Sequence, residues 1–163
     1  MSKAPFTLSA LKTEHDRSVF QSGSEQLDRY LREQATQDVR RRVAACFLAL
    51  ENEKRIIGYY TLASASLPLT SLPPEYRKKL PHYPAVPTVR MGRFAVDKEF
   101  QKRGIGKGLL ANAINRAMRS EVASYAMVVD AKSNEAASFY QHQGFIGIPD
   151  APLMLFFPFA SIK

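Results

Sequence analysis

The order of apolar and polar residues in the first half of the chain predicts three strands. Residues 6–11 alternate between apolar and polar side chains, which is the pattern of a strand buried on one face. Residues 44–51 and 56–65 are rich in apolar and β-compatible side chains, and the polar residues 51–54 form a turn between them. We therefore expect these two segments to pair as an antiparallel hairpin.

A helix is expected between the first strand and the hairpin, beginning near residue 24. Its apolar face carries Leu27, Tyr30, Leu31 and Ala35. Ser22 has the capping-box spacing to Glu25, and Ser24 is the competing N-cap. Asp28 and Arg32 are four residues apart and are expected to pair on another face.

Strands and helices alternate in the second half of the chain. Residues 89–97 predict a strand, and the apolar residues of 105–118 recur at the spacing of an amphipathic helix. Residues 126–130 are typical of a short buried strand. This alternation favours an α/β (α+β) fold, a mixed sheet with helices on its faces.

A further helix and two strands are expected toward the C-terminal end. Ser133 can cap a helix over residues 134–142, and Gly144 ends it. Residues 145–148 and 153–157 then predict two strands, separated by a Pro-Asp-Ala-Pro sequence.

Prolines interrupt the pattern over residues 67–88, where they occupy positions 68, 73, 74, 81, 84 and 87. Only about one helical turn fits there, around Glu75–Leu80. We interpret this segment as an ordered excursion that the apolar residues of Leu80–Pro84 pin to the rest of the domain. A mobile surface loop is the alternative.

Composition is that of one globular domain. The chain has 163 residues, of which 45% are hydrophobic and 23% charged, so a single domain over residues 1–163 can bury a core of its own. Cys46 is the only cysteine and lies in an apolar run, where a buried thiol is favoured over a nucleophile. We see neither a signal peptide nor an apolar run of about 18 residues, and expect a cytoplasmic protein without a membrane partner.

Positive charge points toward anionic partners. Lys and Arg number 23 against 15 Asp and Glu, which gives a net charge of +8. Two exposed clusters are expected, Arg40, Arg41 and Arg42 after the first helix and Arg77, Lys78 and Lys79 in the proline-rich excursion. Each cluster is either a solvated surface or a contact to phosphates.

A glycine-rich loop at the start of the helix over residues 105–118 is the main candidate site. It has glycines at 104, 106 and 108 and basic residues at 102, 103 and 107. Backbone N–H groups at a helix start lack partners in their own helix and suit a phosphate group. Glycine lets such a group approach the backbone, and a Cβ at 104 or 106 would intrude.

Two motifs carry a resemblance to a known family. Residues 101–106 (Gln-Lys-Arg-Gly-Ile-Gly) match the Gln/Arg-x-x-Gly-x-Gly/Ala signature of the GNAT N-acetyltransferases, after a strand that ends in Ala-Val-Asp. Residues 134–145 (Asn-x-x-Ala-x-Phe-Tyr-x-x-x-Gly-Phe) match the second motif of that family. The resemblance implies a central, mostly antiparallel sheet that is splayed where acetyl-CoA binds.

The same resemblance assigns roles to individual residues. Acetyl-CoA is implied as the cosubstrate, without a metal. Its contacts would be Phe94, Ala95, Val96, Gln101, Lys102, Arg103, Gly104, Ile105, Gly106, Lys107 and Asn134. Tyr140 would be the general acid that protonates the departing thiolate after direct attack of an amine in a ternary complex. The three histidines (His15, His82 and His142) are scattered, so no general base is evident.

A narrower resemblance covers almost the whole chain. Four motifs are similar to the acetyltransferase toxins of bacterial type II toxin–antitoxin systems. They are Phe-x-x-Gly-x-x-x-Leu-Asp-x-Tyr-Leu at residues 20–31, Ile-Gly-Tyr-Tyr-Thr-Leu at 57–62, Leu-Pro-x-Tyr-Pro-x-x-Pro at 80–87 and Gly-Arg-x-Ala-Val-Asp at 92–97. Met91 and Phe94 replace the aliphatic residues usual in that family. The resemblance implies acetylation of the α-amino group of aminoacyl-tRNA, a ribbon-helix-helix antitoxin as partner and a homodimer.

The substrate implied by this resemblance fits the basic clusters. Arg90 and Arg93, beside the predicted active site, would join Arg40–Arg42 and Arg77–Lys79 in contacting tRNA phosphates. Two alternatives stay open: an acetyltransferase that acts on a protein amine, polyamine or drug, and a basic nucleic-acid-binding module without catalysis.

Overall fold

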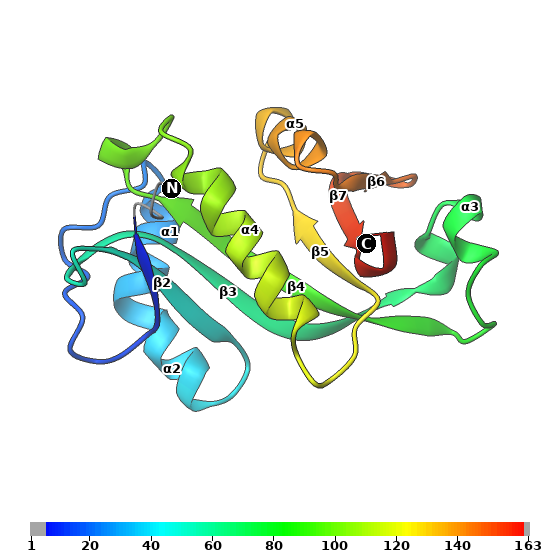
Figure 1. Ribbon diagram of the computed structural model, residues 1–163, viewed down its shortest axis with the longest axis horizontal. Coiled ribbons are helices and arrows are strands. Elements are labelled where there is room, and N and C mark those ends of the chain that lie inside the picture. Colours follow the sequence, from blue (N-terminus) through cyan, green and yellow to red (C-terminus); the bar gives the residue numbers. More distant parts are fainter. Residues whose placement is uncertain (1–5, 162–163) are drawn as a thin grey trace, which may run out of the picture. The chain divides into compact units, whose positions relative to one another are not determined.

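The computed structural model describes residues 6–161 (Figure 1). The strands are β1 (Thr7–Ala10), β2 (Ala45–Glu51), β3 (Arg55–Pro68), β4 (Ala85–Val96), β5 (Ala126–Asp130), β6 (Ile146–Ile148) and β7 (Ala151–Pro158). The helices are α1 (Glu25–Arg29), α2 (Ala35–Arg40), α3 (Pro74–Arg77), α4 (Ile105–Met118) and α5 (Asn134–His142). A π-helical turn, η1 (Tyr30–Gln34), joins α1 to α2.

The strands form a mixed sheet in the order β1-β2-β3-β4-β5-β7-β6. β1 with β2, β2 with β3, β5 with β7 and β6 with β7 pair antiparallel. β4 and β5 are parallel, from the pair Thr88–Ala126 to the pair Met91–Val129. The predicted mixed sheet is confirmed.

The chain forms two compact units. The first holds the residues up to Ala63 together with Gly92–Ala113, and the second holds Ser64–Met91 together with the residues from Ile114 onward. Strands β3 and β4 and helix α4 each contribute to both. The single domain expected from the sequence stays a prediction.

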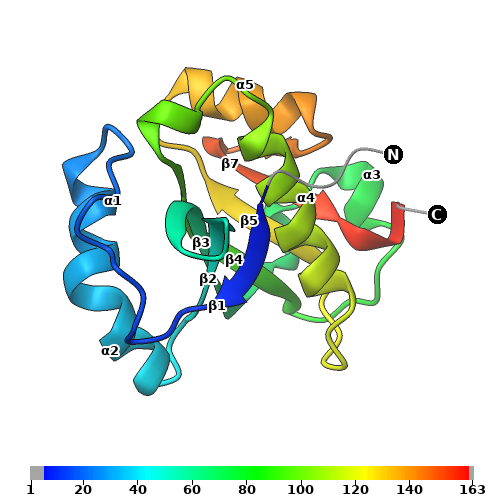
Figure 2. The same cartoon turned by 60° about the vertical axis from the view of Figure 1, so that its left-hand side comes forward.

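Helices cover both faces of the strands in the first unit (Figure 2). On one face Tyr59 of β3 is buried against Tyr30, and their rings stack with centroids 6.4 Å apart. On the other face the hydroxyl of Tyr60 donates a hydrogen bond of 2.6 Å to Asn112 of α4. Consecutive strand residues point to opposite faces of a sheet, so Tyr59 and Tyr60 separate the two helical layers.

The second unit is built in the same way around β7. Tyr76 of α3 lies edge-on to Phe156, with ring centroids 5.3 Å apart. The next residue, Phe157, contacts Phe145 at 5.2 Å, and Phe145 in turn contacts Tyr140 of α5 at 5.3 Å. Since Phe156 and Phe157 point to opposite faces, α3 and α5 cover different sides of β7.

Ser24, rather than Ser22, caps the first helix. Its Oγ accepts a hydrogen bond of 3.2 Å from the N–H of Leu27. The hydroxyl of Ser22 instead donates to Asp28 at 2.7 Å, and its N–H donates to the same carboxylate at 3.0 Å. Ser22 therefore fixes the chain just before the helix.

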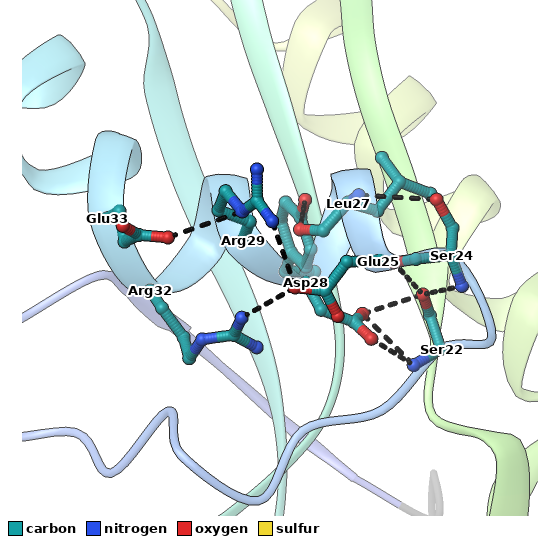
Figure 3. Close-up of polar contacts among 9 residues, drawn as sticks. Ser22, Ser24, Glu25, Leu27, Asp28, Arg29, Arg32 and Glu33 are labelled. Atoms are coloured by element: carbon teal, nitrogen blue, oxygen red, sulfur yellow. Dashed lines mark hydrogen bonds and ion pairs between the residues drawn. The ribbon is translucent and has the colours of Figure 1, made fainter.

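The predicted pair of Asp28 with Arg32 is wrong. Asp28 is only 6% exposed and turns inward to Ser22, because a buried carboxylate must be hydrogen-bonded. Arg32 instead pairs with Glu25 at 3.0 Å, in an exposed network in which Arg29 contacts Glu25 and Glu33 (Figure 3).

The proline-rich excursion is ordered, as expected, but only part of it contacts the core as predicted. β3 extends to Pro68, and the helical turn is α3 rather than a turn over Glu75–Leu80. Leu80 packs against the core of the second unit, whereas Tyr83 is 64% exposed. The predicted Pro-Asp-Ala-Pro turn between β6 and β7 is also shorter than expected, because β7 already begins at Ala151.

Two expectations from composition can be compared with the described residues. Cys46 is buried, and burial raises the pKa of its thiol to about 12, which suits an inert core residue. Over residues 6–161 none of the helices has the length and apolar character needed to cross a membrane.

Candidate functional site

The end of β4 and the loop that follows it form the predicted cofactor segment of the first unit. Ala95 is buried in the core beneath α1 and α2, while Phe94 and Val96 are partly buried. Ile105 begins α4 and is 3% exposed, so only its backbone can face a ligand. Gly106 and Lys107 follow in the first turn, which the N–H of Gly108 closes by donating to the carbonyl of Gly104 at 3.1 Å.

Asp97 anchors this loop to the segment that precedes α1. Its carboxylate is 3% exposed and accepts hydrogen bonds of 3.0 Å from the N–H groups of Gln21 and Glu99. Arg55 lies 3.6 Å from the same carboxylate. The N–H of Lys98 donates back to the carbonyl of Gln21 at 2.7 Å. The loop is thus held at its first residue.

Gln101 makes a second anchor. Its side-chain amide donates to the carbonyl of Ser22 and to that of Val96, both at 2.8 Å. This side chain is therefore engaged with the protein and links the loop to the end of β4 and to the segment before α1. Arg103 lies over the ring of Phe100, with 5.1 Å between the guanidinium carbon and the ring centroid.

The loop backbone combines left-handed residues with open space and basic side chains. Lys102 and Gly104 have φ angles of 64° and 81°, the left-handed values that turn successive amides toward one side. A Cβ at Gly104 would meet no atom of the described chain within 4 Å, so the space beside the loop is open. Lys102, Arg103 and Lys107 are exposed around it. These residues fit the pyrophosphate of acetyl-CoA.

Tyr140 is the buried aromatic residue of α5 in the second unit. It is 8% exposed, and burial raises the pKa of its phenol to about 12, so the hydroxyl keeps its proton near neutral pH. Asn134 is the first residue of the same helix and is exposed. Ser133 caps the helix, and Gly144 ends it with a φ of 101°, both as predicted.

The basic clusters predicted for tRNA lie on exposed ends of helices. Arg40 ends α2, Arg41 is its C-cap and Arg42 has a φ of 61°. In the second unit Arg77 ends α3 and donates to the carbonyl of Thr70 at 3.3 Å, and Lys78 and Lys79 follow it exposed.

Arg90 and Arg93 have different surroundings, although both lie on β4. Arg90 forms an ion pair with Asp130 in the second unit. Arg93 belongs to the first unit, where its guanidinium carbon lies 3.7 Å from the ring centroid of Tyr30. Its N–H donates to the hydroxyl of Thr61 at 3.0 Å.

A hollow in the first unit lies apart from the predicted site residues. It has a volume of about 580 Å³ and is lined by β1, the loop that includes His15 and the turn at Glu53 and Lys54. None of the predicted catalytic or binding residues lines it. Basic and acidic side chains are mixed there, which does not select a ligand of one charge.

The sequence placed both anchors of the loop in motifs but did not reveal which backbone groups they hold. Gln101 was expected to contact acetyl-CoA, and Asp97 was expected only as the last residue of the motif at 92–97. No local pattern identifies Gln21 as its partner, because the two are 76 positions apart. Tyr30 was expected on the apolar face of the first helix and as part of the motif at residues 20–31, and its contact with Arg93 depends on the tertiary fold.

Comparison with known proteins identifies the class to which this fold and loop belong. A family model described as acetyltransferase (GNAT) domain matches residues 43–146, which include the hairpin, the glycine loop and Tyr140. The chain belongs to the GNAT acetyltransferase family.

Individual relatives are more specific. A tRNA-acetylating toxin of Mycobacterium tuberculosis is 35% identical over 142 residues, 86% of this chain and 84% of the relative. The structure of AtaT complexed with acetyl-methionyl-tRNAfMet is 30% identical, with a TM-score of 0.90 over 96% of each chain. A mutant AtaT toxin bound to the C-terminus of the antitoxin AtaR and acetyl-CoA is 26% identical, with a TM-score of 0.80 over 98% of this chain and 96% of that one.

Proposed function

We propose that this chain is the toxin of a type II toxin–antitoxin system and transfers the acetyl group of acetyl-CoA to the α-amino group of aminoacyl-tRNA. The observation that carries the proposal is the similarity, over nearly the whole chain, to AtaT in complex with acetyl-methionyl-tRNAfMet. The net charge of +8 and the exposed basic clusters suit a nucleic-acid substrate. A single domain acting in the cytoplasm, where charged tRNA is used, is part of this proposal.

In the proposed mechanism the chain binds both substrates at once and forms no covalent intermediate. Acetyl-CoA supplies the acetyl group as a thioester. The loop backbone at Lys102 and Gly104 holds its pyrophosphate, and Asn134 contributes a further contact. Backbone groups of Phe94–Val96 align its pantetheine arm, and one amide polarises the thioester oxygen.

Tyr140 is the proposed general acid. When the amine nitrogen attacks the carbonyl carbon, the carbon–nitrogen bond forms, the carbon–sulfur bond breaks and the phenol gives its proton to the sulfur. The proton that the attacking nitrogen loses passes to water, and the phenolate of Tyr140 regains a proton from water before the next turnover. A phenol with a pKa near 12 is a weaker acid than a thiol, so this transfer depends on a direct hydrogen bond to the sulfur. The attacking α-amino group has a reference pKa near 8 and is partly neutral at physiological pH, so a strong general base is not needed.

The test is acetyl transfer from labelled acetyl-CoA to a mixture of tRNAs charged with all amino acids. We expect N-acetylated aminoacyl-tRNA from the unchanged protein, and a loss of turnover of 100-fold or more in Tyr140→Phe with acetyl-CoA affinity retained. Tyr125→Phe is the control, since Tyr125 is a partly buried tyrosine of the same unit that has no proposed catalytic role. Acetylation of a protein amine or polyamine in place of every charged tRNA would contradict the proposed substrate.

An antitoxin is the proposed protein partner. Support comes from the similarity to the AtaT toxin bound to the C-terminus of AtaR. We propose a ribbon-helix-helix antitoxin and a homodimeric toxin. Growth arrest by the toxin alone, relieved by co-expression of the reading frame beside its gene, is the expected result, and arrest that no neighbouring frame relieves would contradict it.

A further inference from the structure

Arg93 differs from the other partly buried arginines. Of the arginines in residues 6–161, four are partly buried: Arg17, Arg55, Arg77 and Arg93. The first three donate side-chain hydrogen bonds, to the carbonyl of Leu31 at 3.0 Å, to Glu99 at 2.9 Å and to the carbonyl of Thr70 at 3.3 Å. The guanidinium of Arg93 has neither a hydrogen bond nor an ion pair within that part of the chain. Its donors are therefore available to a ligand.

The guanidinium of Arg93 lies over the ring of Tyr30. The separation of 3.7 Å between the guanidinium carbon and the ring centroid is close for a cation over an aromatic ring. A contact through the face of a guanidinium leaves its N–H groups able to donate hydrogen bonds in its plane. Besides the hydrogen bond from Tyr30, the positive charge of Arg93 helps to lower the pKa of Asp38, and this carboxylate therefore lies on the same side of the molecule. The backbone of Arg93 is fixed as well, by the hydrogen bond from its N–H to Thr61.

Asp38 holds Tyr30 in turn. The tyrosine hydroxyl donates to Asp38 Oδ2 at 2.7 Å, and Gln34 donates to Oδ1 at 3.1 Å. The tyrosine hydrogen bond lowers the pKa of Asp38, and burial raises that of Tyr30, so the carboxylate stays charged and the phenol stays a donor near neutral pH. The ring of Tyr30 also stacks on Tyr59.

The π-helical turn makes this contact possible. Asp38 is eight residues after Tyr30, and in a regular α-helix the eighth residue lies about 80° around the axis from the first. The wider turn at Tyr30–Gln34 absorbs one extra residue, so Asp38 takes the place of a seventh residue, about 20° away. The irregular turn therefore has a specific result, the support of the Tyr30 ring.

We propose that Arg93 binds a phosphate of the tRNA acceptor end as a two-pronged donor, and that Tyr30 and Asp38 are positioning residues that hold it. This inference rests on the proposed function and deepens it. A guanidinium with its in-plane donors unpaired matches two oxygens of a phosphate. Arg93 also immediately precedes Phe94–Val96, the segment proposed to align the thioester.

Equilibrium binding of uncharged tRNA at several salt concentrations tests the phosphate contact. Arg93→Gln should weaken binding about ten-fold or more and lower the slope of log K against log salt by about 0.7 to 0.9. Arg93→Lys should keep the slope, because the charge remains, yet bind more weakly because the fork and the stacking are lost. Arg29→Gln is the control, an exposed arginine already paired with Glu25 and Glu33.

The positioning role is tested separately, with tRNA binding measured on the folded fraction of each variant. Tyr30→Leu removes the ring beneath Arg93 and should approach the loss of affinity seen in Arg93→Gln, with the salt slope retained. Tyr30→Phe keeps the ring and should recover most of the affinity, and Asp38→Asn should lie between them. A purely structural role would lower the stability of these variants without changing the tRNA Kd of the folded protein.

The possible results separate the inference from the proposed function. Normal tRNA binding by the unchanged protein, with the same Kd and salt slope in Arg93→Gln, would overturn the inference alone. A rise in KM for acetyl-CoA without a rise in KM for charged tRNA would also overturn it, since the phosphate would then belong to the cosubstrate. Absence of tRNA binding by the unchanged protein would overturn both.

Discussion

Burial determines the protonation of several single residues in this protein. Cys46 and Tyr140 are 3% and 8% exposed, and loss of hydration raises the pKa of each to about 12. Both groups are therefore neutral in the folded protein at pH values where they begin to ionise in the unfolded chain. The stability of the protein must fall as the pH rises through that range.

Cys46→Ala should make stability less dependent on pH between about 8.5 and 10. The folded thiol has a raised pKa, so the unfolded chain loses its proton first, and the free energy of unfolding falls by up to about 1.4 kcal/mol per pH unit above the unfolded pKa. Buried tyrosines contribute only above about pH 10. Urea unfolding at pH 7.5, 8.5 and 9.5 checks this. Parallel curves for the variant and the unchanged protein would contradict it.

Gly104→Ala should separate backbone strain from ligand contact. The φ of 81° disfavours alanine, which should cost about 1 to 2 kcal/mol of stability. The added Cβ meets no atom of the described chain within 4 Å, so a loss of acetyl-CoA affinity must come from its contact with the ligand. We expect acetyl-CoA affinity, measured by calorimetry, to fall about ten-fold.

Gly147→Ala is the matched control for that experiment. Its Cβ would also meet nothing within 4 Å, and its φ lies outside the left-handed range. It should leave both stability and acetyl-CoA affinity nearly unchanged. Equal acetyl-CoA affinity in the two variants would show that the loop at Gly104 does not approach the cosubstrate.

Among the structural elements, the first helix shows that polar contacts differ in how much they stabilise the fold. Ser22, Ser24 and Asp28 hold the chain as it enters α1, while Arg29 and Glu33 form an exposed pair (Figure 3). A cap and a buried carboxylate satisfy backbone groups that have no other partner. An exposed ion pair adds little stability, because its two charged groups are also well solvated when they are apart.

Three substitutions in that helix should therefore differ in order of magnitude. Asp28→Ala should lower the free energy of unfolding by about 2 to 3 kcal/mol, because two donations from Ser22 lose their buried acceptor. Ser24→Ala should cost about 1 kcal/mol. Arg29→Gln should change stability by less than about 0.5 kcal/mol. Urea denaturation measures all three, and an equal loss in Arg29→Gln and Asp28→Ala would contradict the assignment.

Periodicity predicted most elements, because the buried face of a strand or helix repeats along the chain. The helix at 105–118, the strand at 126–130 and the helix at 134–142 match α4, β5 and α5. The motifs likewise located the glycine loop and Tyr140, since both are local in sequence. Contacts between residues that are far apart in sequence were missed. Tyr30, the first residue of the π turn, contacts Arg93, which lies 63 residues further along the chain.

At the scale of the whole molecule, the proposed function predicts that ligand binding raises thermal stability. Acetyl-CoA at 100 times its Kd should add about 2.7 kcal/mol to the free energy of unfolding. For a chain of 163 residues this corresponds to a rise in Tm of about 5 to 10 °C. Scanning calorimetry checks the shift, and Gly104→Ala should need about ten times more acetyl-CoA to reach it. No shift at millimolar acetyl-CoA would contradict the proposed cosubstrate.

The two anchors of the glycine loop also connect parts of the chain that are far apart in sequence. Asp97 and Gln101 form hydrogen bonds to the backbone of Gln21 and Ser22, just before the first helix and its π turn. A ligand that reduces the fluctuations of the loop should therefore also reduce those of the backbone at Gln21 and Ser22. We therefore expect slower amide exchange at Gln21 once acetyl-CoA is bound.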